Sequence, residues 1–310
     1  MELGSINPAL LVSALLLAST PILLAAIGEL VVEKSGVLNL GVEGMMILGA
    51  VAGFMVAVES GSPALGFLAA AAAAAVLALL FGVLTQVLLS NQVATGLGLT
   101  LFGLGISSLM GQGYVGVRPP ASPRLDLPVL SELPLLGPVL FSQHALVYLS
   151  LAIVAGVWWY LKSTRSGLVL RAVGESHEAA HALGYSVLGT RLAAIAFGGA
   201  LAGLGGACLS LVIVPQWTEG MTAGRGWIAL AIVVFGSWRA WRVLLGAYLF
   251  GGVSVLQLNL QAAGIAIPVE LLSMSPYLIT ILVLVIISSD KRRAQANAPN
   301  SLGRTFHASG

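Results

Sequence analysis

The chain has 310 residues, of which 58% are hydrophobic and only 8% are charged, and its mean hydropathy is +0.98. A soluble globular domain carries about 25% charged residues. This composition excludes a soluble enzyme, a nucleic-acid-binding module and a disordered chain, and it predicts an integral membrane protein in contact with the lipid bilayer. The net charge of +2 is too small to indicate an acidic partner.

The cysteine count and the first residues exclude further classes. With Cys208 as the single cysteine, no disulfide framework and no cysteine-based metal site can form. No Lys or Arg precedes the first apolar run, which argues against a cleaved signal peptide. We therefore expect no metal and no cofactor.

The apolar runs predict α-helices. In hydrocarbon every backbone N–H and C=O must be satisfied internally, which leaves helices or a closed barrel. The runs show no alternation of polar and apolar residues, which argues against strands. Most of them approach the roughly 20 residues that a helix needs to cross a bilayer. The sequence therefore predicts an all-α, polytopic transmembrane bundle of about nine spans, with eight to ten as the range. The predicted spans are 9–27, 38–58, 64–89, 94–111, 144–161, 191–214, 224–237, 243–262 and 272–289.

Two of these spans are less regular than the others. Segment 38–58 crosses the membrane only if it includes Asn39 and Glu43, because its uninterrupted apolar run begins at Met45. Segment 224–237 has only 14 residues. Either segment could be re-entrant.

The basic residues predict the orientation. Cytoplasmic loops of membrane proteins are enriched in Lys and Arg. With nine spans and a cytoplasmic C-terminus, only Arg118, Arg124 and Arg225 of the fourteen basic residues fall outside the cytoplasmic segments. Omitting segment 224–237 would put a basic cluster on the wrong side, so it is kept as a crossing and the N-terminus is expected outside. The eleven cytoplasmic ones are Lys34, Lys162, Arg165, Arg171, Arg191, Arg239, Arg242, Lys291, Arg292, Arg293 and Arg304.

Three segments are predicted to lie outside the membrane. Segment 112–143 is extracytoplasmic and holds six of the thirteen prolines, so it is semi-rigid and suits a cap or a docking surface. Segment 162–190 is polar and cytoplasmic. Segment 290–310 is a basic cytoplasmic tail, expected to be disordered toward its end. Residues 1–289 then form a single transmembrane domain.

A short helix is predicted at 175–183, inside the cytoplasmic segment. Gly174 precedes it, Glu175 and Glu178 lie in its first turn, where the helix dipole favours anions, and Gly184 follows as a stop. Such a helix is too short and too acidic to bury its apolar face in lipid, so it packs on its own bundle or on a partner. That face is formed by Ala179, Ala180 and Leu183.

This helix also carries a family resemblance. Residues 178–184 read Glu-Ala-Ala-His-Ala-Leu-Gly, which fits EAA-x-x-x-G, the start of the cytoplasmic motif in permeases of binding-protein-dependent ABC importers. With residues 171–175, they resemble the permease group that serves branched-chain amino acids, ribose-type sugars and nucleosides. Segments 33–46, 91–97 and 224–231 resemble its nucleoside branch, which works with basic membrane lipoproteins.

The resemblance covers about residues 20–262 and has two departures. The second half of the general motif, I-x-L-P, is missing where Ala194-Ile195-Ala196-Phe197 stands, as is usual in the branched group. A proline often follows the basic turn after the seventh span, whereas this chain reads Trp238-Arg239-Ala240-Trp241-Arg242 there.

The resemblance implies partners and a coupling site. Such a permease pairs with a second permease subunit, identical or different, with two ATPase subunits and with an extracytoplasmic solute-binding lipoprotein, in a prokaryotic plasma membrane. The chain has no G-x-x-x-x-G-K-[ST] loop, so ATP hydrolysis falls to a separate subunit and no enzymatic activity is expected. The implied ATPase-coupling residues are Gly174, Glu175, Glu178, Ala179, Ala180, Leu183 and Gly184.

Polar side chains within predicted spans are candidates for the solute pathway, because they are costly in lipid. Asn39 and Glu43 could line its inner mouth, where an amide and a carboxylate suit a nucleoside, or they could cap the second span and lie in its first turns. In contrast, Glu29, Glu33 and Lys34 are interpreted as a solvated turn.

Two further polar groups are candidates on the same ground. Asn91, Gln92 and Thr95 open the fourth span and could face the pathway, or Asn91 could cap that helix. Gln257 and Gln261 are an i, i+4 pair in the eighth span. They could bind the solute or a neighbouring helix.

Other features have structural interpretations. The tryptophans at 158, 159, 238 and 241 are predicted to anchor the bundle at the membrane interface. His177 and His181 lack a third metal ligand nearby and are interpreted as a solvated helix face. Close helix packing is predicted at two sets of glycines. They are Gly198, Gly199, Gly203, Gly205 and Gly206 in the sixth span, and Gly96, Gly98, Gly103 and Gly105 in the fourth.

The sequence therefore favours an ABC importer permease that moves a nucleoside-like small polar solute inward. Branched-chain amino acids and simple sugars are the alternative solutes. An ion-coupled secondary transporter is disfavoured, because Glu43 is the one candidate for a buried relay within a predicted span.

Overall fold

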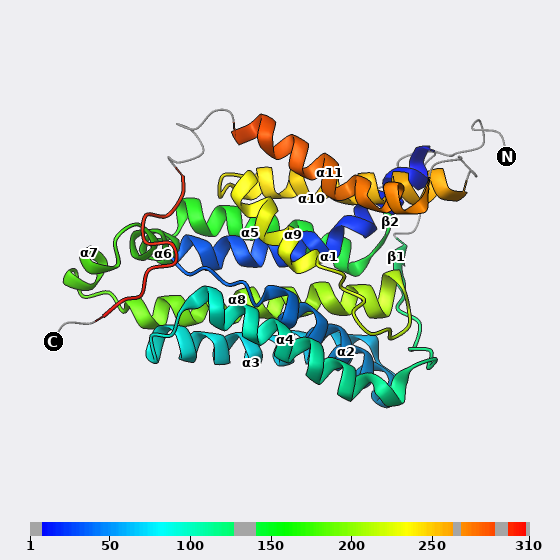
Figure 1. Cartoon of the computed structure of the whole chain (residues 1–310), viewed down its shortest axis with the longest axis horizontal. Helices are drawn as coiled ribbons and strands as arrows, with labels where there is room; N and C mark the ends of the chain where they lie inside the picture. The colour runs from blue at the N-terminus through cyan, green and yellow to red at the C-terminus, as the bar shows by residue number, and fades with distance from the viewer. Residues whose placement is uncertain (1–7, 127–140, 263–267, 289–296, 308–310) are drawn as a thin grey trace.

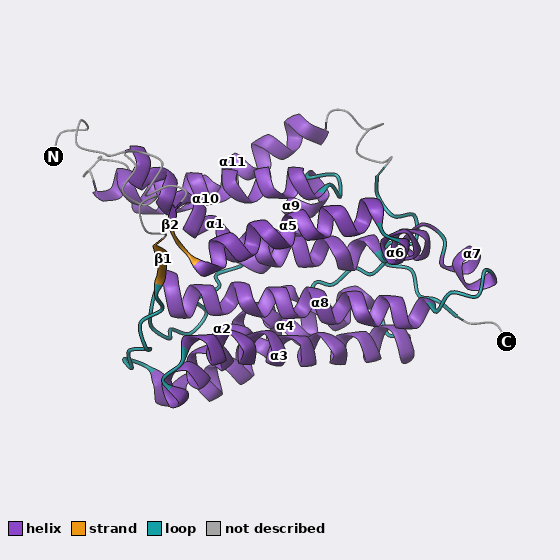
Figure 2. Ribbon diagram, turned by 180° about the vertical axis from the view of Figure 1, so that it is seen from behind, coloured by secondary structure: helices purple, strands orange, loops and turns teal. Residues whose placement is uncertain are grey.

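The computed structural model describes residues 8–126, 141–262, 268–288 and 297–307, and these are almost entirely helical. The longer helices lie roughly side by side along the long axis of the molecule (Figures 1 and 2). The helices are α1 (Pro8–Lys34), α2 (Val42–Ser60), α3 (Pro63–Gly82), α4 (Gln92–Gly111), α5 (Ala145–Ser163), α6 (Arg165–Glu175), α7 (His177–Ala182), α8 (Val187–Cys208), α9 (Arg225–Phe235), α10 (Ala240–Ala262) and α11 (Val269–Ser288).

The predicted spans match this architecture. Seven helical segments of the described chain are long and apolar enough to cross a membrane, and α9 is a shorter apolar helix. Each of the nine predicted spans contains a helix. The short elements are the π-helical turns η2 (Val83–Val87) and η5 (Leu209–Ile213), the 3₁₀ turn η3 (Gln112–Tyr114), and the strands β1 (Arg124–Asp126) and β2 (Ser142–His144).

The two ends of the bundle differ. One end, here the α7 end, carries α6, α7 and the C-terminal residues 297–307 (Figure 1). The other end, here the β end, carries β1 and β2, which form a two-stranded antiparallel sheet in the proline-rich segment. The sequence did not predict this sheet. Residues 127–140 of that segment lie outside the described residues.

Helix α1 is longer than predicted. It continues to Lys34 instead of ending near residue 27. The interpretation of Glu29, Glu33 and Lys34 as a solvated turn is wrong: Glu29 and Glu33 are fully buried, and Lys34 is half-buried. Both carboxylates have donors, since Glu29 accepts from the Asn39 backbone N–H at 3.3 Å and Glu33 accepts from the indole of Trp238.

Two helices begin inside the bundle. Residues 35–41 are not helical, so α2 starts at Val42 and the expected helix over residues 38–41 is absent. Residues 214–224 are also not helical, and α9 follows with 11 residues. Figure 1 shows both helices starting partway along the bundle. Each of these segments therefore combines non-helical chain with a helix.

The close packing predicted at the glycines of α8 is confirmed. Each of the five glycines there has atoms of α1, α2 or α3 where a Cβ would stand. In α4 the prediction is half right. Gly96 and Gly103 pack against the start of α2, whereas Gly98 and Gly105 face open space.

This difference within α4 can be tested with matched alanines. A Cβ at position 103 would lie 2.6 Å from the Gly44 carbonyl oxygen, so Gly103→Ala should lower the free energy of unfolding by about 1–3 kcal/mol. Gly105→Ala meets no atom and should leave stability unchanged or raise it by about 0.5 kcal/mol. Thermal unfolding in detergent measures both. Equal effects would contradict the close α2–α4 packing.

Candidate functional site

The start of α9 is held by a buried carboxylate from α2. Glu43 is 3% exposed. Its Oε1 accepts from the Thr222 hydroxyl at 2.6 Å and from the Gly224 backbone N–H at 2.8 Å. Its Oε2 accepts from the Gly226 backbone N–H at 2.6 Å. The side chain therefore satisfies backbone donors at the N-terminus of α9, where the helix dipole also favours a negative charge.

Glycine makes this contact possible. A Cβ at Gly226 would lie 2.6 Å from the Glu43 Cα, so only glycine lets α9 approach α2 this closely. Gly224 has a φ of +80°, which glycine adopts without strain. The sequence left two roles open for Glu43, lining the pathway or lying in the first turns of α2. It lies in the first turn of α2, but it caps α9, which no local sequence spacing could indicate.

Asn39 and Gln92 hold the non-helical chain that precedes α2. The Asn39 side chain accepts from the Gly41 N–H at 3.0 Å, and the Gln92 side chain accepts from the Leu38 N–H at 2.8 Å. Both are buried. Asn39 was expected as a possible helix cap, but the N-cap residue is Gly41, and Asn39 forms a turn before it. The two amides replace the hydrogen bonds that a helix would have supplied.

The other predicted pathway residues differ in their surroundings. Asn91 caps α4 by accepting from the Ala94 N–H at 3.0 Å. The hydroxyl of Thr95 lies 2.8 Å from that of Ser90. Gln257 and Gln261 are half-buried on α10. The structure therefore does not bring all seven candidates together. Asn39, Glu43 and Gln92 surround the start of α2, Asn91 and Thr95 lie beside Gln92 at the start of α4, and Gln257 and Gln261 lie on α10.

An aromatic side chain beside the α2–α9 junction was missed as a candidate. Trp227, in the first turn of α9, is 45% exposed, and its indole N–H donates to the Leu40 carbonyl at 3.4 Å. Helix α4, which packs on α2, is also open on its far side. Leu101 is 71% exposed and Phe102 is 50% exposed. Trp227 lies in segment 224–231, which resembles the permease family, and this position could have marked it as a candidate. The sequence does not show that its side chain is exposed.

The role of Glu43 predicts a stability effect. Glu43→Gln should turn one acceptor into an NH₂ donor that faces buried N–H groups, and it should lower the free energy of unfolding by about 1–3 kcal/mol. Glu59→Gln is the matched control on α2, because Glu59 is exposed and accepts from the Tyr114 hydroxyl at the surface. Thermal unfolding of both variants in detergent tests this. If they unfold alike, Glu43 does not secure α9.

The predicted coupling segment contains two helices. The expected helix over 175–183 is corrected: α6 ends at Glu175, and α7 begins at His177, with Ser176 as its cap. The Ser176 hydroxyl accepts from the Ala179 N–H at 3.2 Å. The stop at Gly184 is confirmed by its φ of +84°. The Ser176 hydroxyl accepts directly from a free backbone N–H at the start of the short helix, which Glu175 was expected to stabilise through the helix dipole.

Helix α7 has one buried side and one open side. Ala180 is 2% exposed and packs with Val173 and Val187, whereas Ala179 is exposed and Leu183 is 76% exposed. The predicted apolar face is thus divided, and its outer part is exposed. This open side is available to a partner.

His177 is buried, contrary to the predicted solvated face. Its imidazole is 9% exposed, and its ring lies edge-on to Phe306, with centroids 5.4 Å apart. Burial, together with the positive charge of Arg191, lowers the pKa of His177 below its usual value. The imidazole is therefore neutral at pH 7 and can accept a hydrogen bond at Nδ1, which lies 3.4 Å from Arg191 Nη2. In the described chain no three His, Cys, Asp or Glu side chains are grouped as a metal site would require.

Arg191 links the coupling segment to the bundle. It is fully buried, and it donates to the Ser35 carbonyl at 3.2 Å, to the Gln86 side chain at 3.0 Å and to the Arg304 carbonyl at 3.1 Å. The α1–α2 connection, the η2 turn and the C-terminal segment thus meet at one guanidinium, which also faces His177.

The C-terminal segment packs against this end. The Ser301 N–H donates to the Gly174 carbonyl at 2.9 Å, and the Gly303 N–H donates to the Gly36 carbonyl at 3.1 Å. These backbone contacts hold residues 297–307, whereas the disorder was predicted for the end of the tail. Residues 308–310 lie outside the described residues.

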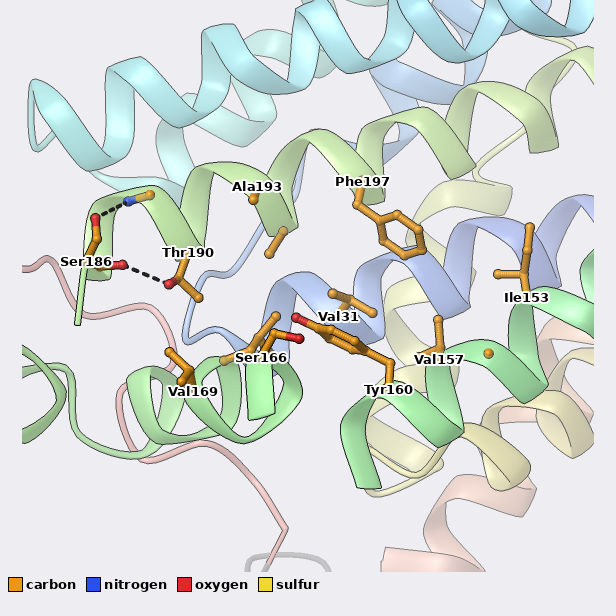
Figure 3. A pocket seen from close by; sticks show the side chains of 14 residues that line it. Val31, Ile153, Val157, Tyr160, Ser166, Val169, Ser186, Thr190, Ala193 and Phe197 are labelled. Atoms are coloured by element: carbon orange, nitrogen blue, oxygen red, sulfur yellow. Dashed lines mark hydrogen bonds between the residues drawn. The ribbon is translucent and has the colours of Figure 1, made fainter. Parts of the chain in front are cut away.

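A cavity of 740 Å³ lies between α5, α6 and α8 (Figure 3). Its walls are mostly apolar, with Val31, Tyr160 and Phe197 around it. At one end the Ser186 hydroxyl accepts from the Gly189 N–H, and the Thr190 hydroxyl donates to the Ser186 carbonyl. With so few free polar groups, this cavity does not suit a polar solute. It leaves space beside α6.

In the part of the chain that the structure describes, seven membrane-length helical segments and the shorter α9 define a polytopic helical membrane protein. The family described as "Branched-chain amino acid transport system / permease component" matches residues 11–287, and the chain belongs to it. The protein is thus a multi-pass ABC transporter permease component. Members of this family work with separate ATPase subunits, solute-binding proteins and a paired permease, and this chain is not itself an enzyme.

Among the proteins to which the chain is similar, two are named for glucose and one for nucleosides. It is 40% identical to "Putative glucose ABC transporter permease protein TsgC13" of Haloferax volcanii, over 96% of this chain and 97% of the relative. It is 32% identical to the nucleoside ABC transporter permease protein NupC of Lactococcus lactis, over 94% and 96%. It is also 32% identical to the glucose ABC transporter permease protein TsgB13 of Haloferax volcanii, over 77% and 68%. No solved structure matches the chain.

Proposed function

We propose that this permease carries a nucleoside-like small polar solute inward across a prokaryotic plasma membrane, with the α7 end in the cytoplasm. The observation that carries the proposal is helix α7, packed on its inner side and open on its outer side. The predicted cytoplasmic basic residues Arg165, Arg171 and Arg304 belong to the same end, which agrees with the positive-inside rule.

In this proposal α7 docks into a cleft of the ATPase. Its open side, with Ala179 and Leu183, would contact the ATPase, and Ala180 would anchor the helix to Val173 and Val187. Motion of α7 would pass to α6 and, through His177 and Arg191, to the loop that precedes α2. The cavity beside α6 offers the space that such a motion needs (Figure 3).

A charge on the open side of α7 tests this coupling. Leu183→Arg should lower ATP-dependent uptake in proteoliposomes by about tenfold or more, since an unpaired cation would enter the ATPase contact. Thermal stability should not change, because Leu183 is 76% exposed. Leu168→Arg, on the exposed side of α6, is the control and should transport normally. Normal uptake by Leu183→Arg would contradict the coupling assignment.

We further propose that the pathway forms between two permeases along the open side of α4 and Trp227. A lone chain exposes Leu101, Phe102 and Trp227, and a paired permease would cover this surface and enclose a passage. Haloferax volcanii has two different permeases similar to this chain, which supports a heterodimer. Asn39, Glu43 and Gln92 then shape the α2–α9 junction beside the passage, with no direct solute contact.

The solute class follows from the exposed indole. A planar base can stack on Trp227 from the passage, and the hydroxyls of the ribose can bond to water or to backbone groups near Leu40. The nucleoside permease among the relatives agrees with this choice. A hexose is the second candidate, because a similar protein at 40% identity is named for glucose, and a sugar ring can also pack on an aromatic face.

The proposed stacking is tested at Trp227. Trp227→Ala should reduce uptake of labelled nucleoside by about tenfold, and Trp227→Tyr should retain most of it. Trp159→Ala is the control, because Trp159 is 59% exposed on α5 and away from the junction. Competition with glucose in the same assay separates the two solute classes. Uptake that is insensitive to Trp227→Ala would exclude Trp227 from the pathway.

A further inference from the structure

A second cavity, of 550 Å³, is lined by cations and tryptophans at the α7 end. Its lining comes from the end of α1, the C-terminal parts of α5 and α6, the turn between α9 and α10, and the first turn of α10. The five cations are Lys34, Lys162, Arg171, Arg239 and Arg242, and the three tryptophans are Trp158, Trp238 and Trp241.

The cations in this basic cavity repel one another. The positive charges of Arg171 and Arg239 act against that of Lys34, whereas the carboxylates of Glu175 and Glu33 act in its favour. No carboxylate of the described residues forms an ion pair with Arg171, Arg239 or Lys162. The nearby carboxylate of Glu33 accepts from the Trp238 indole. Like charges that converge on one cavity from four parts of the chain are unfavourable unless an anion joins them. The cavity therefore has the charge of an anion site.

The tryptophans give this cavity the character of a membrane interface. The Lys162 ammonium lies over the Trp158 ring, 4.9 Å from its centroid, and the rings of Trp158 and Trp241 are 6.2 Å apart. Both indoles are partly exposed, at 38% and 49%. Tryptophan prefers the headgroup level of a bilayer, so the anion bound here would lie at that level.

An exposed apolar strip continues from the cavity toward the middle of the bundle. On α5, Leu151 and Ala155 share the helix face of Trp158 and Lys162, at spacings of three, four and seven residues. On α10, Leu245 lies one turn from Trp241 and is 67% exposed. Free phosphate or a nucleotide would not use such a strip, whereas the acyl chains of a lipid would cover it.

We propose that the basic cavity binds an anionic phospholipid, with the phosphate among Arg171, Arg239 and Lys34 and the acyl chains along α5 and α10. Basic pockets between membrane helices suit such headgroups. The site is separate from the α2–α9 junction and from the open side of α7. Bound lipid would neutralise the cations and connect α1, α5, α6 and α10 at the end that couples to the ATPase.

Native mass spectrometry of the complete transporter in neutral detergent tests this site. Dioleoyl phosphatidylglycerol should bind more tightly than dioleoyl phosphatidylcholine. The double variant Arg171→Gln, Arg239→Gln should weaken phosphatidylglycerol binding roughly thirtyfold, since each cation near a membrane surface contributes about a factor of five. Arg165→Gln, an exposed cation of α6 that does not line the cavity, is the control and should bind as the unmodified protein does.

Tryptophan quenching by brominated phosphatidylglycerol gives an independent measurement. Trp241→Phe should reduce the quenching, and Trp159→Phe, outside the cavity, should reduce it less. Equal binding of the two lipids, or equal losses in the double variant and in Arg165→Gln, would overturn the proposal. Tight binding of inorganic phosphate without competition from lipid would also overturn it. So would a loss of ATPase affinity in the double variant with unchanged lipid binding.

Discussion

The structure depends on one buried contact, between Glu43 of α2 and the N-terminus of α9. A helix that begins inside a membrane leaves backbone N–H groups without partners, and each one is costly in an apolar environment. Glu43 accepts from two of them and from the Thr222 hydroxyl. Gly226 allows the close approach. With this contact formed, two broken segments that are far apart in sequence meet at one junction, and the solute pathway is proposed to pass beside it.

Arg191 has a comparable role at the α7 end. Its side chain bonds to the α1–α2 connection, the η2 turn and the C-terminal segment, and it faces His177 of α7. A movement of α7 therefore has a direct mechanical route to the residues before α2, and from there to the Glu43 junction. The same end holds the basic cavity, so the proposed lipid and the proposed ATPase contact act on neighbouring parts of the bundle.

The similarity to known proteins and the geometry answer different questions. The family match shows that the chain is an ABC permease component. It leaves the solute open, because similar permeases are named for glucose and for nucleosides. The geometry contributes the particular surfaces: an exposed indole at Trp227, an open side of α7 at Leu183, and a group of cations facing tryptophans. Leu183, Arg171 and Arg239 are exposed, so they can be altered without removing a buried side chain.

The sequence by itself determined the membrane class, a helix in each of the nine predicted spans, the capping of α4 by Asn91 and the stop at Gly184. These follow from local hydrophobicity and local backbone chemistry, which act over a few residues. Only the tertiary structure decided that Glu29, Glu33 and His177 are buried, that Glu43 caps a helix 182 residues further along, and that residues 297–307 pack against the α7 end. From sequence alone, a polar residue can be interpreted as solvated or as functional, and its hydrogen-bond partner is needed to decide between the two. Here each partner comes from a distant part of the chain, brought close by packing that no local pattern encodes.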